Sequence, residues 1–98
     1  MKKTINGIRY DTNNAVLIGE YNHGSLGSIN FTRESLYITP RSKTYFLAGI
    51  GGPNTKYGIV SDNKNRISGE KILPLSRKSA FEWAKEYLDP CIAEFFLK

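Results

Sequence analysis

One histidine and one cysteine are the side chains best suited to covalent or metal chemistry in this chain. His23 has no Cys, His or Asp cluster with metal-ligand spacing around it, and its neighbours Asn22 and Gly24 predict an exposed turn. Cys91 is expected in the first turn of the last helix, where the helix dipole lowers a thiol's pKa. No base is placed beside it, so we interpret Cys91 as a small buried apolar residue next to Ile92.

The carboxylates and the glycines give no stronger sign of catalysis. Glu20, Glu34 and Glu70 are dispersed, and the sequence brings no two of them together. The segment 49–56 is only superficially like a phosphate-binding loop, because that loop needs Gly-Lys-Ser/Thr opening a helix and Pro53 removes an N–H. We interpret its glycines as a strand-end loop that permits close backbone approach. We therefore expect no enzyme, no metal and no cofactor.

Basic residues interleaved with aromatic ones are a better indication of function. Nucleic-acid surfaces use cations for phosphates and aromatic faces for unpaired bases, whereas protein interfaces concentrate their binding energy in Tyr, Trp and Arg. The sequence leaves both open, and some of the tyrosines fit a core equally well. The candidate partner-binding residues are Tyr37, Arg41, Lys43, Tyr45, Lys56, Tyr57, Lys64, Arg66 and Lys71.

The positive charge lies in the middle of the chain. The 98 residues carry a net charge of +5, and residues 41–78 alone hold eight Lys and Arg against two Asp and Glu. Such a segment suits phosphates or an acidic protein surface, although solvated lysines that keep a protein soluble are the alternative.

The beginning of the chain predicts a hairpin followed by a helix. Asn6-Gly7 between short β-prone runs is typical of a type I′ turn, which needs positive φ at both residues. Asp11 or Thr12 is a suitable N-cap for a helix over residues 13–21.

The central segment predicts a second hairpin. Residues 36–39 and 44–48 flank a turn at 40–43, and in this register Ile38 opposes Tyr45. One face carries Leu36, Ile38, Tyr45 and Leu47 and is the better core face. The opposite face, with Tyr37 and Phe46, is either covered or a contact surface that would allow a homodimer. Residues 28–32 are a possible third strand.

The last third predicts loops, a short strand and two helices. Residues 49–69 hold five glycines and are expected to form long loops, followed by a strand over 71–73 that ends at Pro74. A helix starts at about Ser76 or Ser79, where Ser79 and Glu82 fit a capping box, and ends at Leu88. Asp89-Pro90 then begins a second short helix.

These elements predict one α+β domain over residues 1–98. A small antiparallel sheet, made of the N-terminal hairpin and the central hairpin, is packed by a C-terminal helix pair. The composition is globular, with 40% hydrophobic residues. A single cysteine, no apolar run long enough for a membrane span, and no apolar stretch behind Lys2 and Lys3 indicate a cytoplasmic protein that contacts no membrane.

Several motifs along the chain resemble a group of small proteins carried by bacterial phages and mobile elements. Some of those proteins are anti-CRISPR candidates that block a Cas effector. The motifs that carry the resemblance are Thr4-Ile5-Asn6-Gly7-x-Arg9-Tyr10-Asp11-Thr12, Glu34-x-Leu36-Tyr37-x-Thr39, Tyr45-Phe46-Leu47-x-Gly49-x-Gly51-Gly52, Ile72-x-Pro74-Leu75-Ser76 and Ala80-x-Glu82-Trp83-Ala84.

The resemblance implies a non-enzymatic inhibitor acting in the cytoplasm of a host bacterial cell. Its partner would be a host defence protein, namely a Cas effector or its RNA complex. The chain departs from the group at Arg77-Lys78-Ser79, where an acidic first turn is expected, so mimicry of DNA is disfavoured. A nucleic-acid-binding accessory protein of a mobile element, with direct contact to DNA or RNA, is the alternative.

Overall fold

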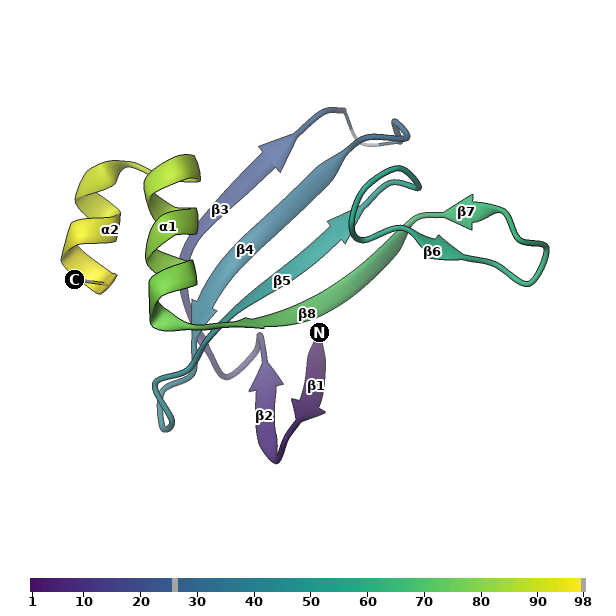
Figure 1. The fold of residues 1–98 in the computed structure, drawn as a ribbon. Coiled ribbons are helices and arrows are strands. Elements are labelled where there is room, and N and C mark those ends of the chain that lie inside the picture. The colour runs from purple at the N-terminus through teal and green to yellow at the C-terminus, as the bar shows by residue number, and fades with distance from the viewer. Residues whose placement is uncertain (26, 98) are drawn as a thin grey trace.

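The computed structural model describes residues 1–25 and 27–97 and has the predicted α+β fold, with antiparallel sheets and two C-terminal helices (Figure 1). The elements in chain order are β1 (Lys2–Ile5), β2 (Ile8–Asp11), β3 (Val16–His23), β4 (Thr32–Ile38), β5 (Tyr45–Gly51), β6 (Ile59–Val60), β7 (Arg66–Ile67), β8 (Gly69–Leu75), α1 (Arg77–Tyr87) and α2 (Pro90–Leu97).

A four-stranded antiparallel sheet with the order β3-β4-β5-β8 forms the centre of the molecule. The predicted register of the central hairpin is confirmed, because Ile38 lies opposite Tyr45. The possible third strand over residues 28–32 is wrong except at its last residue, since β4 begins at Thr32. The prediction that this strand ends at Pro74 is wrong, since β8 continues to Leu75. The sheet tolerates Pro74 because β8 is an edge strand, and on its outer side there is no neighbouring strand to which a backbone N–H must donate.

The helix predicted over residues 13–21 is wrong, and β3 stands in its place. The carboxylate of Asp11 accepts hydrogen bonds from the Asn13 backbone N–H and the Asn14 amide, which makes a turn rather than a helix start. β3 pairs with β4 and carries a bulge between Leu17 and Gly19. Tertiary pairing with a long neighbouring strand therefore outweighs the local helix propensity.

Each face of the central sheet is covered by a different part of the chain. On one face, Leu36 and Leu47 pack against Trp83 of α1 and Ala93 of α2, as expected for the better core face. On the other, Phe46 is fully buried beneath the β1–β2 hairpin, with its ring 5.2 Å from that of Tyr10. Of the two alternatives for this face, the covered one is therefore confirmed, since the chain's own hairpin packs over Phe46.

The turn of that N-terminal hairpin has the predicted conformation. Asn6 and Gly7 have φ values of 52° and 80°, which suits a tight turn between β1 and β2.

The two helices begin at polar caps. Ser76, rather than Ser79, is the N-cap of α1, and its hydroxyl accepts a hydrogen bond from the Ser79 backbone N–H, so the predicted capping box is wrong. Asp89 caps α2 as predicted, by accepting from the Cys91 N–H at 2.9 Å. Cys91 itself is exposed, which corrects its interpretation as a buried residue. No helix in the described part of the chain is long and apolar enough to cross a membrane.

Candidate functional site

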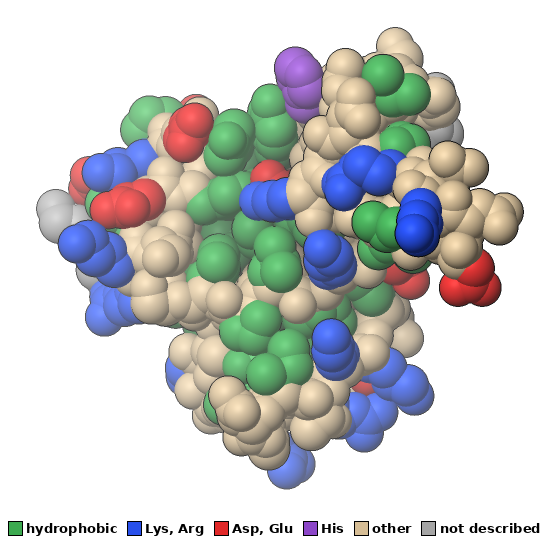
Figure 2. Space-filling model, turned by 45° about the vertical axis from the view of Figure 1, so that its right-hand side comes forward, with side chains coloured by type: hydrophobic (Ala, Val, Ile, Leu, Met, Phe, Trp, Pro, Cys, Tyr) green, Lys and Arg blue, Asp and Glu red, His purple; other side chains and the backbone are tan. Residues whose placement is uncertain are grey.

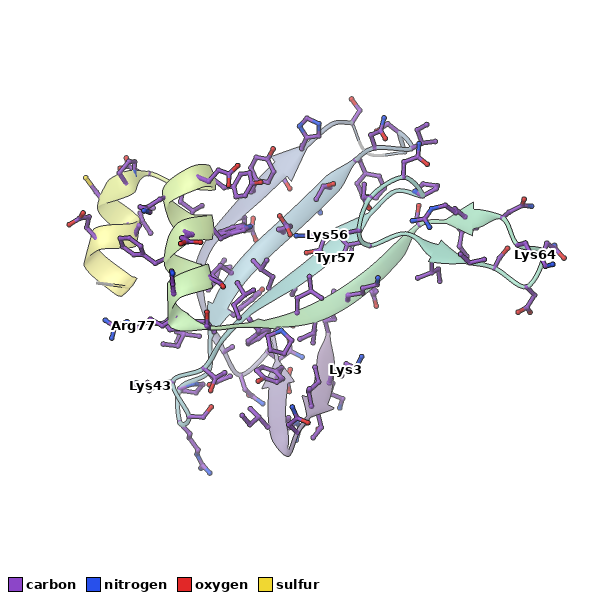
Figure 3. All side chains as sticks on the ribbon, in the orientation of Figure 1. Lys3, Lys43, Lys56, Tyr57, Lys64 and Arg77 are labelled. Carbon is purple, nitrogen blue, oxygen red and sulfur yellow. The ribbon has the colours of Figure 1, made fainter. Side chains whose placement is uncertain are left out.

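The site is built around Tyr57, which follows β5 in the loop of residues 52–58 and folds back over the sheet (Figure 3). Its ring lies directly above Gly49, where any Cβ would overlap the ring. The prediction that glycines of this segment permit close backbone approach is confirmed at Gly52, next to the backbone of Ser28 and Ile29, whereas at Gly49 the approaching group is the Tyr57 side chain. As a result, Tyr57 is 0% exposed.

Tyr57 reaches a buried carboxylate on the neighbouring strand. Glu34 of β4 lies opposite Gly49 of β5, and the Tyr57 hydroxyl donates a 2.6 Å hydrogen bond to Glu34 Oε2. The Trp83 indole N–H of α1 donates to Glu34 Oε1 at 3.2 Å, and Lys56 Nζ lies 2.7 Å from Oε2. The carboxylate thus ties the sheet, α1 and the 52–58 loop together at one point.

These contacts keep Glu34 ionised. Burial by itself would raise the pKa of Glu34, but the hydrogen bonds from Lys56, Tyr57 and Trp83 outweigh burial and hold that pKa below its ordinary value. Burial and the adjacent Glu34 carboxylate raise the pKa of Tyr57, so its hydroxyl stays a donor. The arrangement is a satisfied buried charge, and within the described residues no buried side-chain N or O atom lacks a hydrogen-bond partner.

Two further cations hold the loop from the outside. Arg66 Nε donates to the Pro53 carbonyl at 2.7 Å, and Lys71 Nζ donates to the Lys56 carbonyl at 2.9 Å. Both side chains satisfy backbone carbonyls of a loop that lacks a sheet ladder of its own. The loop is therefore fixed on its inner side by Glu34 and on its outer side by basic residues.

A groove of about 360 Å³ runs between α1 and this loop, with β3 and β4 as its floor. Figure 2 shows hydrophobic side chains gathered in the hollow between the helices and the loop. The rings of Tyr21 and Tyr87 are 4.2 Å apart, and the ring of Tyr21 also stacks on His23 at 6.5 Å. The groove thus combines aromatic walls with the Glu34–Lys56 ion pair.

Beside the loop, the short β6–β7 hairpin projects from the body of the molecule (Figure 1). Its β-branched residues are open to solvent, with Ile59 43%, Val60 61% and Ile67 44% exposed. Lys64 lies at its turn with a positive φ of 63°. We call this hairpin, residues 59–67, the projecting hairpin. It presents aliphatic side chains next to exposed positive charge.

The structure places the predicted binding residues in three environments: the 52–58 loop with the projecting hairpin, the β4–β5 turn and, for the tyrosines, buried or half-buried positions. Lys56 and Lys71 lie at the 52–58 loop, where Lys56 pairs with Glu34 and Lys71 donates to the Lys56 carbonyl. Arg66 and Lys64 belong to the projecting hairpin, and Figure 3 shows Lys64 at its tip, apart from Lys56. Arg41 and Lys43 lie in the β4–β5 turn, and Figure 3 shows Lys43 and Lys64 at opposite ends of the molecule.

The three tyrosines of that prediction are not free contact residues. Tyr45 belongs to the core beneath the helices, Tyr57 is buried under the loop, and Tyr37 is half-buried with its ring 5.3 Å from that of Phe46. Tyr45 and Tyr57 are therefore corrections, since a buried ring cannot meet a partner. Their aromatic surface fills apolar space inside the molecule.

Sequence reasoning missed the part that Glu34 and Trp83 have in the site. One signal was present, because Glu34 interrupts the inward-facing positions of a strand whose other inward residues are Leu36 and Ile38. A charged residue at such a position needs partners, although 49 residues separate Glu34 from Trp83 and no local pattern connects them.

His23 lies at the end of β3 and lines the groove rather than standing in an isolated turn. In residues 1–25 and 27–97, the His, Cys, Asp and Glu side chains form no group of three or more that could hold a metal ion. Comparison of the chain with protein-family models, curated proteins and solved structures finds no match.

Proposed function

We propose that this chain is a non-enzymatic binding protein whose contact element is the projecting hairpin together with the 52–58 loop. The observation that carries the proposal is the exposure of Ile59, Val60 and Ile67 on an element that extends from the body and carries Lys64 at its turn. Ile59 and Ile67 lie opposite each other and share one face of the hairpin, whereas Val60 lies on the other face opposite Arg66. Exposed aliphatic residues next to charged ones are typical of protein-binding surfaces.

The loop supports such a role because it is held in one conformation. The buried Glu34–Tyr57 bond and the Arg66–Pro53 bond fix it on two sides. A contact element that is ordered before binding loses less conformational entropy when the partner arrives. The partner expected for this surface is a protein with an apolar patch and acidic residues around it.

The more specific proposal concerns which partner this is. The motif resemblance points to an inhibitor that a phage or mobile element uses against a host defence protein, namely a Cas effector or its RNA complex. The excess positive charge of residues 41–78 favours an acidic protein surface or a guide RNA as the site of attack.

The experiment is a plaque assay on hosts with active CRISPR immunity, comparing matched variants. Val60→Asp and Lys64→Glu should abolish protection of the phage. Val16→Asp and Lys43→Glu are the controls, because Val16 is also half exposed at 52% and Lys43 also has a positive φ of 54° in a turn. Equal effects of the two pairs would contradict the proposed surface.

The second candidate function is binding of nucleic acid, which the exposed basic residues Lys64, Arg66 and Lys71 of the projecting hairpin and β8 favour. The burial of Tyr45 and Tyr57 removes two of the rings on which unpaired bases could stack. Gel shifts with single- and double-stranded DNA and RNA at low salt decide this candidate. Binding of nucleic acid requires that the affinity falls steeply as the salt concentration rises. It also requires that Lys64→Glu weakens this affinity when no protein partner is present.

A further inference from the structure

A second, larger cleft lies at the opposite end of the molecule from the projecting hairpin. It has a volume of about 520 Å³ and separates the Asn6–Gly7 turn of the N-terminal hairpin from the β4–β5 turn. Figure 1 shows both turns at the same end of the molecule. The residues that line it on the two sides include Ile8, Arg9 and Asn14, and Pro40, Arg41 and Ser42.

The first wall is held in place by a buried carboxylate. Asp11 is 8% exposed, and its Oδ2 lies 3.6 Å from an Arg9 guanidinium nitrogen. The same Oδ2 accepts a hydrogen bond from the Asn14 amide at 3.2 Å. One carboxylate outside the cleft lining thus contacts both Arg9 and Asn14.

The second wall is held by a network of hydroxyl groups. The Thr39 and Ser42 hydroxyls lie 2.6 Å apart, and the Thr44 hydroxyl donates to that of Ser42 at 3.0 Å. The Thr44 backbone N–H donates to the Thr39 hydroxyl at 2.9 Å. These bonds fix the turn that carries Arg41, so both walls are ordered in the free protein.

The chemistry of this cleft suits an oxyanion. Its lining residues include Arg9, Arg41, Asn14 and Ser42 and, among the described residues, no Asp or Glu, with the Asp11 carboxylate behind Arg9 at 3.6 Å. Guanidinium groups bind phosphate through paired hydrogen bonds, and the volume is in the range of small-molecule sites. We propose that the cleft binds the phosphate groups of a small molecule of nucleotide size, with Ile8 and Pro40 contacting its apolar part.

Isothermal titration with ATP, pyrophosphate and adenosine at low salt tests this proposal. ATP and pyrophosphate should bind, adenosine should not, and ATP should shift the amide NMR signals of Gly7 and Ser42. Arg9→Gln/Arg41→Gln should weaken ATP binding by roughly tenfold or more, because charge-assisted hydrogen bonds are lost. Both arginines are exposed, so the melting temperature should stay close to that of the unchanged chain.

The matched control is Lys78→Gln/Lys85→Gln, which removes two exposed charges outside the cleft. ATP affinity in this variant should remain within about twofold of the unchanged protein. The proposal is overturned if neither ATP nor pyrophosphate binds, if adenosine binds as tightly as ATP, or if the control loses as much affinity. Tighter, arginine-dependent binding of a single-stranded oligonucleotide than of ATP would also overturn it, in favour of a nucleic-acid contact.

Discussion

The Tyr57 hydroxyl donates a 2.6 Å hydrogen bond to the buried carboxylate of Glu34, which lies 23 residues earlier in the sequence. The Tyr57 ring can reach this position because Gly49 beneath it has no side chain. This one bond joins the loop next to the projecting hairpin to the centre of the sheet. The Trp83 indole N–H of α1 donates to the same carboxylate, so the sheet, α1 and the 52–58 loop share one acceptor group. The order of the proposed contact element depends on this relationship.

Gly49→Ala should destabilise the protein by about 1–3 kcal/mol, because the new methyl group overlaps the Tyr57 ring and forces it out of its place. Urea denaturation measures the cost. The same change in a Tyr57→Ala background should cost much less, since the obstructing ring is gone and residues in contact are not additive. Equal costs in both backgrounds would show that the ring is not what excludes a side chain at position 49.

Tyr57→Phe should cost roughly 1.5–3 kcal/mol of unfolding free energy, the range for a hydrogen bond to a charged group. The ring stays in place above Gly49, so this variant isolates the hydroxyl. Tyr37→Phe is the matched control, since Tyr37 is only half-buried and no carboxylate bond holds its hydroxyl within the described contacts. Similar losses in the two variants would contradict the special position of Tyr57.

The stability of the protein should fall in acid partly through Glu34. Its pKa is below the ordinary value of 4.5, so the unfolded chain takes up the proton first and the folded state loses its advantage as the pH falls. The contribution is complete above the ordinary pKa and disappears as the pH drops through the folded-state pKa. Urea midpoints between pH 7 and pH 3 should decline less steeply for Glu34→Gln, and parallel declines would exclude this contribution.

Ser76→Ala should destabilise the protein by about 1 kcal/mol through loss of the α1 N-cap. Ser79→Ala tests the alternative start suggested by the sequence. It leaves the cap oxygen and the Ser79 backbone N–H in place and removes only the Ser79 hydroxyl, which accepts a hydrogen bond from the Ser76 hydroxyl at 3.0 Å. Thermal melts of the two variants distinguish a helix whose N-cap is Ser76 from one whose N-cap is Ser79. A larger drop in melting temperature for Ser79→Ala than for Ser76→Ala would contradict the Ser76 cap and support the capping box of Ser79 and Glu82.

Local patterns predicted the elements whose causes are local. The Asn6-Gly7 turn, the register of Ile38 with Tyr45 and the Asp89 cap follow from the backbone preferences of a few adjacent residues. The fold class follows from their order along the chain. In contrast, the helix prediction over residues 13–21 is wrong, because pairing with β4, which no local pattern reveals, determines the conformation of β3.

The candidate site could not be assembled from sequence, because its members are brought together by long-range contacts. The sequence identifies basic residues at positions 56, 64, 66 and 71, and the structure places three of them on or against the 52–58 loop, with Lys64 at the turn of the projecting hairpin. Nothing in the spacing indicated that Tyr57 turns inward to Glu34 or that Trp83 meets the same carboxylate. Residue type alone also could not distinguish these four basic residues from Arg41 and Lys43, which lie in the β4–β5 turn, away from the projecting hairpin.

The most direct test of the proposed function is the efficiency of plating of a CRISPR-targeted phage on a panel of immune hosts that express this chain. The unchanged chain should restore plaques in at least one host. Val60→Asp should remove the effect, and Val16→Asp should retain it. Failure of the unchanged chain to restore plaques in any host, or equal activity of the Val60→Asp variant, would contradict an inhibitor that acts through the projecting hairpin.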